Sequence, residues 1–190
     1  MTVEEGNTAL SPTLNVPEGA EVGTVAGGCF WGVEHMYHKY YDGKGLIDTK
    51  VGYMGGDVAY PKYKQVLTDT TGHCEVLQFS FDPKIVSYEE LIQFFYRIHD
   101  ATSATKQGRN EGRNYRSAVF FHSPEQERIA KEQAKIVSHE YYEDVPIASE
   151  ITPATIFWDA EEYHQMYFEK GSEGYHCPSH YLREKPAKQV

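Results

Sequence analysis

The stretch over residues 22–41 constrains the fold most, because its hydrophobic pattern changes from that of a strand to that of a helix. Residues 22–26 form a short apolar run, which is typical of a buried strand. Over residues 30–41 the apolar side chains recur with helical spacing, at Val33, Met36, Tyr37 and Tyr40. Gly27 and Gly28 therefore mark a strand-to-helix junction, where the lack of side chains lets the backbone approach a ligand closely.

A single cysteine, Cys29, stands at this junction. The N-terminus of a helix offers unpaired N–H groups and a positive partial charge, both of which favour a thiolate over a thiol. A lone buried cysteine is usually inert packing, but this position predicts a reactive thiol. The neighbouring rings of Phe30 and Trp31 are placed to wall an apolar slot beside it.

The rest of the chain alternates strand-like and helix-like segments without a strict order. We expect strands over residues 46–53, 74–81, 115–121, 149–152 and 155–158. We expect helices over residues 63–67, 88–99, 124–142 and 161–168, and an irregular coil from residue 170. This order differs from that of a doubly wound parallel sheet. It predicts an α+β fold, a two-layer α/β sandwich in which helices cover a mixed sheet.

Composition excludes several classes of partner. The chain of 190 residues is long enough for one domain with a core of its own. Its formal net charge of −10 repels nucleic acid and anionic membranes, so neither is expected to bind. No apolar run approaches the length of a transmembrane helix.

The ends of the chain differ from its middle. Residues 1–20 contain no lysine or arginine and fit neither a secretory signal nor a transit peptide. We expect them to be a flexible leader, followed by a single catalytic domain over residues 21–190 of a cytoplasmic, monomeric protein. Within that domain, the glycines near residues 170–190 predict a mobile tail, and the tail carries Cys177.

The chain has three cysteines, and the odd number argues against a framework of structural disulfides. A reducing compartment fits better, where cysteines are reactive, metal-bound or simply buried. Cys177 follows several glycines, so it either swings towards another thiol or is a surface cysteine with no task. Cys74 lies on a predicted strand and is interpreted as structural.

Glu75 is the second candidate for chemistry. Strict alternation places it on the same face as the apolar residues Leu77, Phe79 and Phe81. If that face is the inner one, burial would keep the carboxyl protonated near neutral pH, as a general acid beside a thiolate requires. The alternative is that Glu75, at the end of its strand, reaches solvent.

Two tyrosines, Tyr63 and Tyr115, lie in or beside polar loops, where a phenol either donates a hydrogen bond to a ligand oxygen or simply packs. The nine histidines include no His-Glu-x-x-His, and the cysteines form no Cys-x-x-Cys. Phosphate-loop and dinucleotide fingerprints are also missing from the sequence. We therefore expect neither a metal nor a cofactor.

Several motifs together resemble the A class of peptide-methionine sulfoxide reductases, and its fungal members in particular. The resemblance covers about residues 22–184. It is carried by Gly28-Cys29-Phe30-Trp31-Gly32, Gly52-Tyr53-Met54-Gly55-Gly56, Tyr63-Lys64-Gln65-Val66, Gly72-His73-Cys74-Glu75-Val76, His99-Asp100, Tyr115-Arg116-Ser117, Ala160-Glu161-Glu162-Tyr163-His164-Gln165 and Gly174-Tyr175-His176-Cys177-Pro178.

The resemblance implies the two-layer fold of that family and reduction of the S epimer of methionine sulfoxide, free or in proteins, as a repair of oxidative damage. It implies that Cys29 is the nucleophile, Glu75 the proton donor and Cys177 the resolving cysteine, with thioredoxin as the external reductant. Tyr63 and Tyr115 would hold the sulfoxide oxygen.

The family's substrate pocket implies roles for three further positions. Phe30 and Trp31 would surround the S-methyl group. Asn110 stands where many members carry an acidic residue, and an amide there can still hydrogen-bond in the pocket. Cys74 stands where members commonly carry alanine, which leaves open whether it takes part in the redox cycle.

Two other classes of function stay open on the residues alone. One is a hydrolase or acyltransferase that pairs Cys29 with a histidine base. The other is a binding module without catalysis, in which Cys29 and Cys177 form a redox switch. Consumption of methionine sulfoxide would separate the reductase from both.

Overall fold

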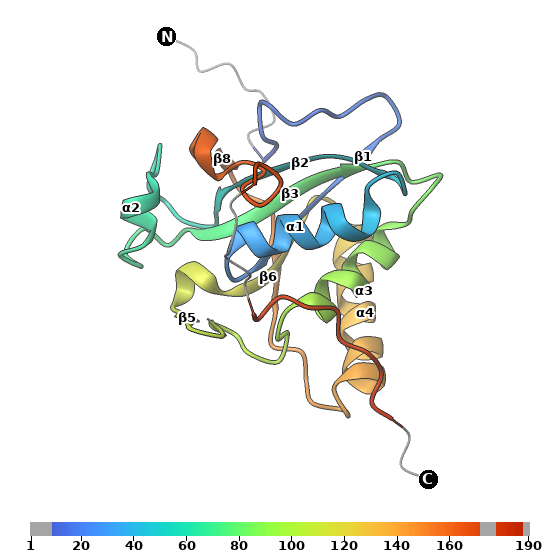
Figure 1. The fold of residues 1–190 in the computed structure, drawn as a ribbon. Helices are drawn as coiled ribbons and strands as arrows, with labels where there is room; N and C mark the ends of the chain where they lie inside the picture. The colour runs from blue at the N-terminus through green and yellow to red at the C-terminus, as the bar shows by residue number, and fades with distance from the viewer. Residues whose placement is uncertain (1–8, 172–177, 188–190) are drawn as a thin grey trace.

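The computed structural model describes residues 9–171 and 178–187, and their main sheet has the strand order β7-β6-β1-β3-β2-β8 (Figure 1). β6 and β7 are parallel, and the other neighbouring strands are antiparallel. The mixed sheet predicted from the sequence is thereby confirmed. The strands are β1 (Glu21–Gly27), β2 (Leu46–Met54), β3 (Cys74–Phe81), β6 (Ser117–Phe121), β7 (Glu150–Pro153) and β8 (Trp158–Asp159).

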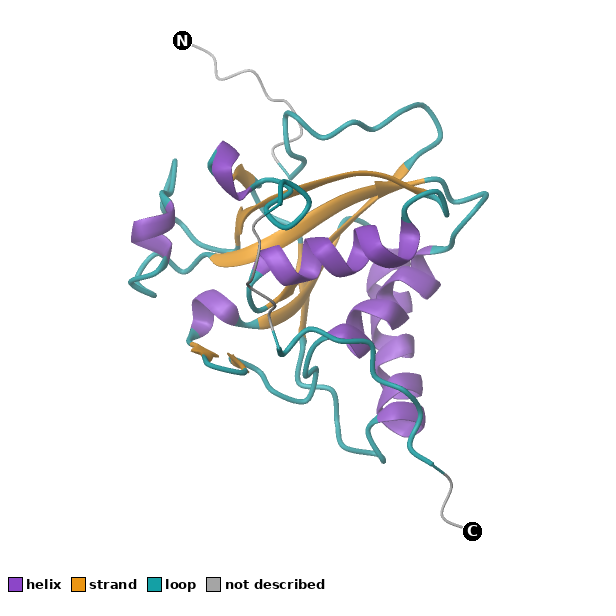
Figure 2. Ribbon diagram, in the orientation of Figure 1, coloured by secondary structure: helices purple, strands orange, loops and turns teal. Residues whose placement is uncertain are grey.

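Helices cover one face of this sheet, namely α1 (Phe30–Tyr41), α3 (Tyr88–Ile98) and α4 (Pro124–Tyr141) (Figure 2). The hydroxyls of Ser87 and Ser123 accept N–H groups in the first turns of α3 and α4, as expected of helix caps. The apolar sides of the three helices share one core with the sheet, which includes Tyr37, Phe79, Leu91 and Val137. The two-layer α+β architecture follows from this packing.

The opposite face of the sheet is covered by the N-terminal segment and by Ala154 and Phe157, from between β7 and β8, instead of by helices. The N–H of Ser11 donates to Gln78 Oε1 at 2.7 Å, and the hydroxyl of Ser80 donates to the carbonyl of Asn15 at 2.6 Å. Residues 9–15 are therefore attached to the sheet, in contrast to the flexible leader expected over residues 1–20. The physical reason is that every residue of β3 is buried. The side chains on the face opposite to the helices, Gln78 and Ser80 among them, therefore need contacts of their own. Residues 1–8 lie outside the described residues.

One predicted helix is wrong. In place of a helix over residues 161–168, the chain forms a short 3₁₀ turn, η2 (Glu162–His164). The side chain of Gln165 exchanges hydrogen bonds with the backbone N–H and C=O of Val51, and Met166 has a positive φ of 52°. These contacts tie the segment to β2 and end the helical conformation.

The segment before β6 also differs from expectation. The strand predicted over residues 115–121 begins only at Ser117, because residues 113–115 form a 3₁₀ turn, η1 (Arg113–Tyr115). The polar loop before it contains a small hairpin of β4 (Lys106–Gln107) and β5 (Asn110–Glu111). The short helix expected near residue 63 is confirmed as α2 (Tyr63–Val66).

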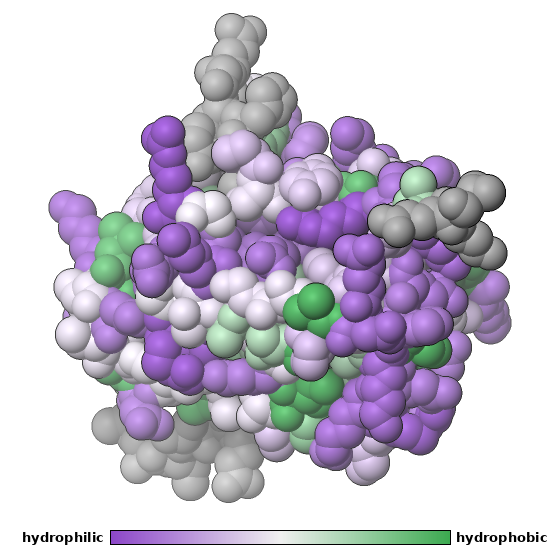
Figure 3. Space-filling model, turned by 90° about the horizontal axis from the view of Figure 1, so that it is seen from below, coloured by the Kyte–Doolittle hydropathy of each residue, from purple (hydrophilic) through white to green (hydrophobic). Residues whose placement is uncertain are grey.

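The face of the molecule seen in Figure 3 is mostly hydrophilic, with hydrophobic side chains in small patches among polar ones. This surface agrees with the net charge of −10. Over the described ranges, no helix combines the length and the apolar character that a membrane span requires.

Candidate active site

Cys29 occupies the N-cap of α1, directly after β1, as the sequence predicts. Its backbone is extended, with φ −60° and ψ 117°, and the residue is 9% exposed. The preceding Gly28 has a φ of +85°, and a Cβ there would lie 2.8 Å from Cβ of Gln107. Only glycine fits this position without strain, so the sharp turn that presents Cys29 depends on it.

The carboxyl group of Glu75 lies at the same helix end. Its Oε2 accepts the backbone N–H of Phe30 at 3.0 Å, and the residue is 2% exposed. β1 and β3 are antiparallel neighbours with Val25 opposite Leu77, so the end of β1 meets the start of β3. The inward orientation of Glu75 is confirmed, and the alternative that it reaches solvent is wrong. A carboxyl group is thus fixed beside the residue that follows the cysteine.

An aromatic cluster borders this helix end. The ring of His164 lies 5.2 Å from that of Phe30, 5.5 Å from that of Trp31 and 4.4 Å from that of Tyr63. The indole N–H of Trp31 donates to His164 Nδ1 at 3.0 Å, and Tyr167 stacks on Trp31 at 3.8 Å between ring centroids. These contacts hold Trp31 in one orientation.

His164 was not among the residues singled out by the sequence analysis, although it stands in a motif that carries the resemblance. The indole donor requires an unprotonated Nδ1, so the proton of the neutral ring lies on Nε2. Burial lowers the pKa of His164 from its ordinary value, which favours this neutral form. No local periodicity marks such a residue, because its partner Trp31 is far away in sequence.

Tyr63 brings a phenol to the site from α2. Burial raises the pKa of Tyr63 to about 12, and the charges of Glu75 and Cys29 add to the rise. The carboxylate of Glu161 accepts the Tyr63 backbone N–H at 3.2 Å and the Tyr53 hydroxyl at 3.1 Å, which ties α2 to β2. At neutral pH the Tyr63 hydroxyl therefore keeps its proton and can donate it in a hydrogen bond.

Tyr115 and Asn110 are on neighbouring pieces of backbone. Tyr115 ends η1, which packs beside β3 and is held by Asp69 through the backbone N–H groups of residues 113 and 114. Asn110 lies in β5 opposite Gln107, the residue that touches Gly28. The hairpin therefore lies against the turn that presents the cysteine.

Of the other two cysteines, the structure describes only Cys74. Cys177 lies outside the described residues. Cys74 is fully buried on the face of β3 opposite to Glu75, and burial raises its pKa to about 12. This environment disfavours a thiolate and agrees with a structural role. Within residues 9–171 and 178–187, no three histidine, cysteine or acidic side chains gather as a metal site would need.

Comparisons with known proteins agree with this geometry. A sequence profile described as peptide methionine sulfoxide reductase matches residues 21–189. The chain is 45% identical over 164 residues to a protein of Schizosaccharomyces pombe named probable peptide methionine sulfoxide reductase, covering 86% of this chain and 96% of that relative.

Solved structures of a yeast protein share the fold. The crystal structure of Mxr1 from Saccharomyces cerevisiae in reduced form matches with a TM-score of 0.86 and 40% identity, covering 93% of this chain and 99% of that one. The crystal structure of Mxr1 in complex with Trx2 matches with a TM-score of 0.65 and 33% identity, with the same coverage.

Proposed function

The chain belongs to the peptide methionine sulfoxide reductase family, and on that basis we propose that it reduces the S epimer of methionine sulfoxide, free and in proteins, with Cys29 as the nucleophile. The observation that best supports this assignment is the hydrogen bond from the Phe30 N–H to Glu75. It fixes a carboxyl group next to a cysteine at a helix N-terminus.

The first step needs an activated sulfoxide, because its sulfur is a poor electrophile until the oxygen is protonated or hydrogen-bonded. The Cys29 thiolate attacks that sulfur while Glu75 gives a proton to the oxygen. Tyr63 and Tyr115 donate hydrogen bonds to the same oxygen. The oxygen passes to the cysteine sulfur, so methionine leaves and Cys29 becomes a sulfenic acid.

The substrate's methyl group lies between Phe30 and Trp31. Phe30 is rigid because it is buried against Tyr53, at 5.9 Å between ring centroids. Trp31 is rigid because His164 holds its indole N–H. Asn110 supplies a polar contact at the edge of the pocket.

The second step restores the thiol. The Cys177 thiol attacks the sulfenic sulfur of Cys29, a disulfide forms, and the oxygen leaves as water. A thioredoxin dithiol then reduces the disulfide by exchange. The complex of the yeast relative with Trx2 supports this choice of reductant.

These roles belong to one catalytic domain over residues 21–190, whose tail over residues 170–190 brings Cys177 to Cys29. The three cysteines suit a reducing compartment, and we place the protein in the cytoplasm.

The test is a single turnover of the reduced protein with each epimer of free methionine sulfoxide. We expect about one methionine per chain from the S epimer and the loss of two thiols by mass, because the sulfenic acid formed on Cys29 condenses with a second thiol. A hydrolase would leave the sulfoxide unchanged, and a redox switch would form the disulfide without releasing methionine. Full activity in Cys29→Ser would end the proposal.

A further inference from the structure

Gly32, in the first turn of α1, has a neighbour from the far end of the chain. A Cβ on Gly32 would lie 2.3 Å from Nδ1 and 2.9 Å from Cγ of His180. The imidazole therefore rests on the helix where a side chain would otherwise be. Glycine inside a helix costs about 1 kcal/mol relative to alanine, so helix formation does not explain it. The contact with His180 does.

The same imidazole makes a second contact on the other side of Cys29. His180 Nε2 donates to the carbonyl of Gly27 at 2.7 Å, and His180 is 9% exposed. The ring thus joins the end of β1 to the first turn of α1. These two elements flank the cysteine in sequence.

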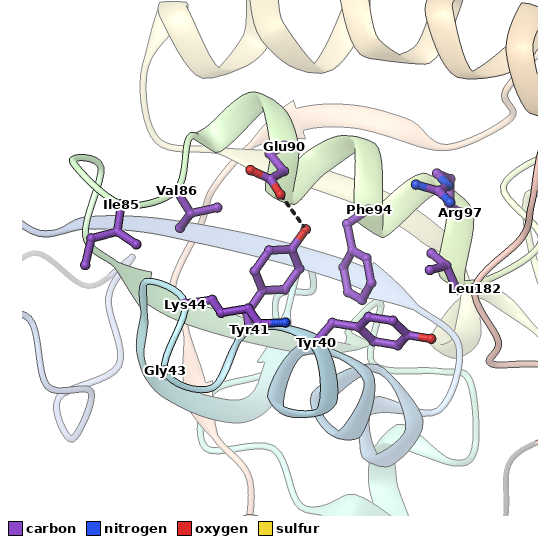
Figure 4. Close-up of a pocket in the computed structure, with 10 residues that line it drawn as sticks. All are labelled: Tyr40, Tyr41, Gly43, Lys44, Ile85, Val86, Glu90, Phe94, Arg97 and Leu182. Carbon is purple, nitrogen blue, oxygen red and sulfur yellow. Dashed lines mark hydrogen bonds between the residues drawn. The ribbon is translucent and has the colours of Figure 1, made fainter.

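The residues that follow His180 hold the tail in place on α3. The N–H of Arg183 donates to the carbonyl of Arg97 at 2.9 Å. Leu182 lies beside Arg97 and Phe94 at the edge of a cavity of about 490 Å³ between α1 and α3 (Figure 4). The tail is therefore attached to the domain at His180, Leu182 and Arg183.

We propose that His180 is a positioning residue for the second half of the reaction: by docking on Gly27 and Gly32, it anchors the chain beside Cys29 at a point three residues after Cys177, and so favours the reaction between these two cysteines. This inference rests on the proposed function. Cys177 precedes His180 by three residues, and three extended residues span about 10 Å at most. A short tether raises the effective concentration of one thiol at the other.

The docking of His180 affects only the step in which the disulfide forms. The Cys177 sulfur bonds to the sulfenic sulfur of Cys29, the S–O bond breaks, and the oxygen leaves as water with the thiol proton. Transfer of oxygen from the substrate to Cys29 precedes this step and does not involve the tail. Loss of docking should therefore slow the formation of the disulfide and leave methionine release unchanged.

The test compares His180→Ala and Gly32→Ala with the parent protein in single turnovers with methionine sulfoxide, stopped by acid and alkylation. Methionine and alkylated thiols are counted by mass over time. We expect unchanged methionine release and about a tenfold slower loss of thiols in each variant, because the local thiol concentration falls. The double variant should be no slower than either single one, since both remove one contact.

Two controls separate docking from general damage. His139→Ala removes a histidine whose side chain is 77% exposed, and it should match the parent in both steps. Turnover driven by dithiothreitol, which can reduce the sulfenic acid directly, should stay at the parent's rate in His180→Ala, whereas turnover driven by thioredoxin should fall.

The outcomes decide the two proposals separately. A parent that releases no methionine would contradict the proposed function. A normal parent with an equally fast thiol loss in His180→Ala would overturn the role of His180 alone. A parallel fall in methionine release would also overturn it, because His180 would then shape the Cys29 turn itself. If Gly32→Ala fails to fold, His180→Ala still decides.

Discussion

The backbone N–H of Phe30 donates a hydrogen bond of 3.0 Å to the carboxyl group of Glu75. Glu75 is thereby held at the N-terminus of α1, beside Cys29 and with 2% of its surface exposed. An otherwise unpaired N–H of the first helical turn is satisfied by a side chain from β3. One contact thus joins the candidate nucleophile and the candidate acid.

Replacing Glu75 by glutamine should remove the proton donor but keep the shape of the site. The amide oxygen can still accept the Phe30 N–H, so the fold should persist. We expect methionine release to slow by roughly 10²- to 10⁴-fold, as is usual when a general acid is lost. Rapid-quench measurement of methionine, with thermal unfolding as the control for folding, tests this. A near-normal rate would remove Glu75 from the mechanism.

Replacing Cys177 by serine should stop the cycle after its first half. We expect about one methionine per chain and no sustained turnover with thioredoxin, because the sulfenic acid finds no second thiol. Mass spectrometry of the protein should detect the added oxygen or its adduct with a sulfenic-acid reagent. Continued thioredoxin-driven cycling in this variant would contradict the prediction and point to Cys74.

Replacing Cys74 by alanine is the matched variant. Its thiol is fully buried and its pKa is raised to about 12, so it should contribute packing and no redox chemistry. We expect normal turnover and a loss of about 1 kcal/mol in the free energy of unfolding. Turnover with thioredoxin and urea unfolding measure the two effects. Lost turnover in a folded protein would assign Cys74 a redox role.

Glu34 should make stability depend on pH. Burial raises the pKa of its carboxyl to about 7, although it accepts hydrogen bonds from Thr49 and from the Met166 N–H. Between its ordinary value of 4.5 and about 7, the folded state binds more protons than the unfolded one. The free energy of unfolding therefore falls as pH rises through this range.

Glu34→Gln removes that dependence, because glutamine stays neutral. The free energy of unfolding of the variant minus that of the parent should be larger at about pH 8 than at about pH 5. The increase between the two pH values should be on the order of 3 kcal/mol. Urea unfolding of both proteins at the two pH values measures this difference, and other titrating groups cancel in it. If the free energy of unfolding changed equally with pH in the parent and the variant, Glu34 would keep its charge in the fold.

His164 should act through Trp31. In His164→Phe the indole N–H loses its acceptor, and a buried donor left unpaired costs about 1–3 kcal/mol. We expect KM for methionine sulfoxide to rise about fivefold or more while kcat changes less, since the pocket wall loosens. Steady-state kinetics test this, together with Trp31 fluorescence in a Trp158→Phe background. An unchanged KM would argue that His164 is only packing.

The local sequence patterns were sufficient to predict the helix and the strand nearest to Cys29. The helical spacing of apolar residues predicted α1 with its observed bounds, and the alternation along β3 placed Glu75 on the inner face. Both patterns depend on neighbours in sequence. The motifs around Cys29 and Glu75 carried the resemblance to the family, which the comparisons confirm. The roles of the individual site residues remain predictions.

The segments that pattern analysis missed depend on distant partners. Residues 9–15 were expected to be part of a flexible leader, because nothing in the segment itself reveals its hydrogen bonds to Gln78 and Ser80. Residues 161–168 were expected to form a helix, because the bonds of Gln165 to Val51 are not visible in the segment itself. In both cases long-range hydrogen bonds outweigh a local preference.

The sequence by itself determined the strand-to-helix junction that presents Cys29, since backbone geometry and hydrophobic period are local properties. Only the tertiary structure decided what surrounds that cysteine: Glu75 on the first helical N–H, His164 behind Trp31, and His180 on Gly32. These partners are 45 residues or more away along the chain, and they meet because the sheet and the tail bury them at one helix end.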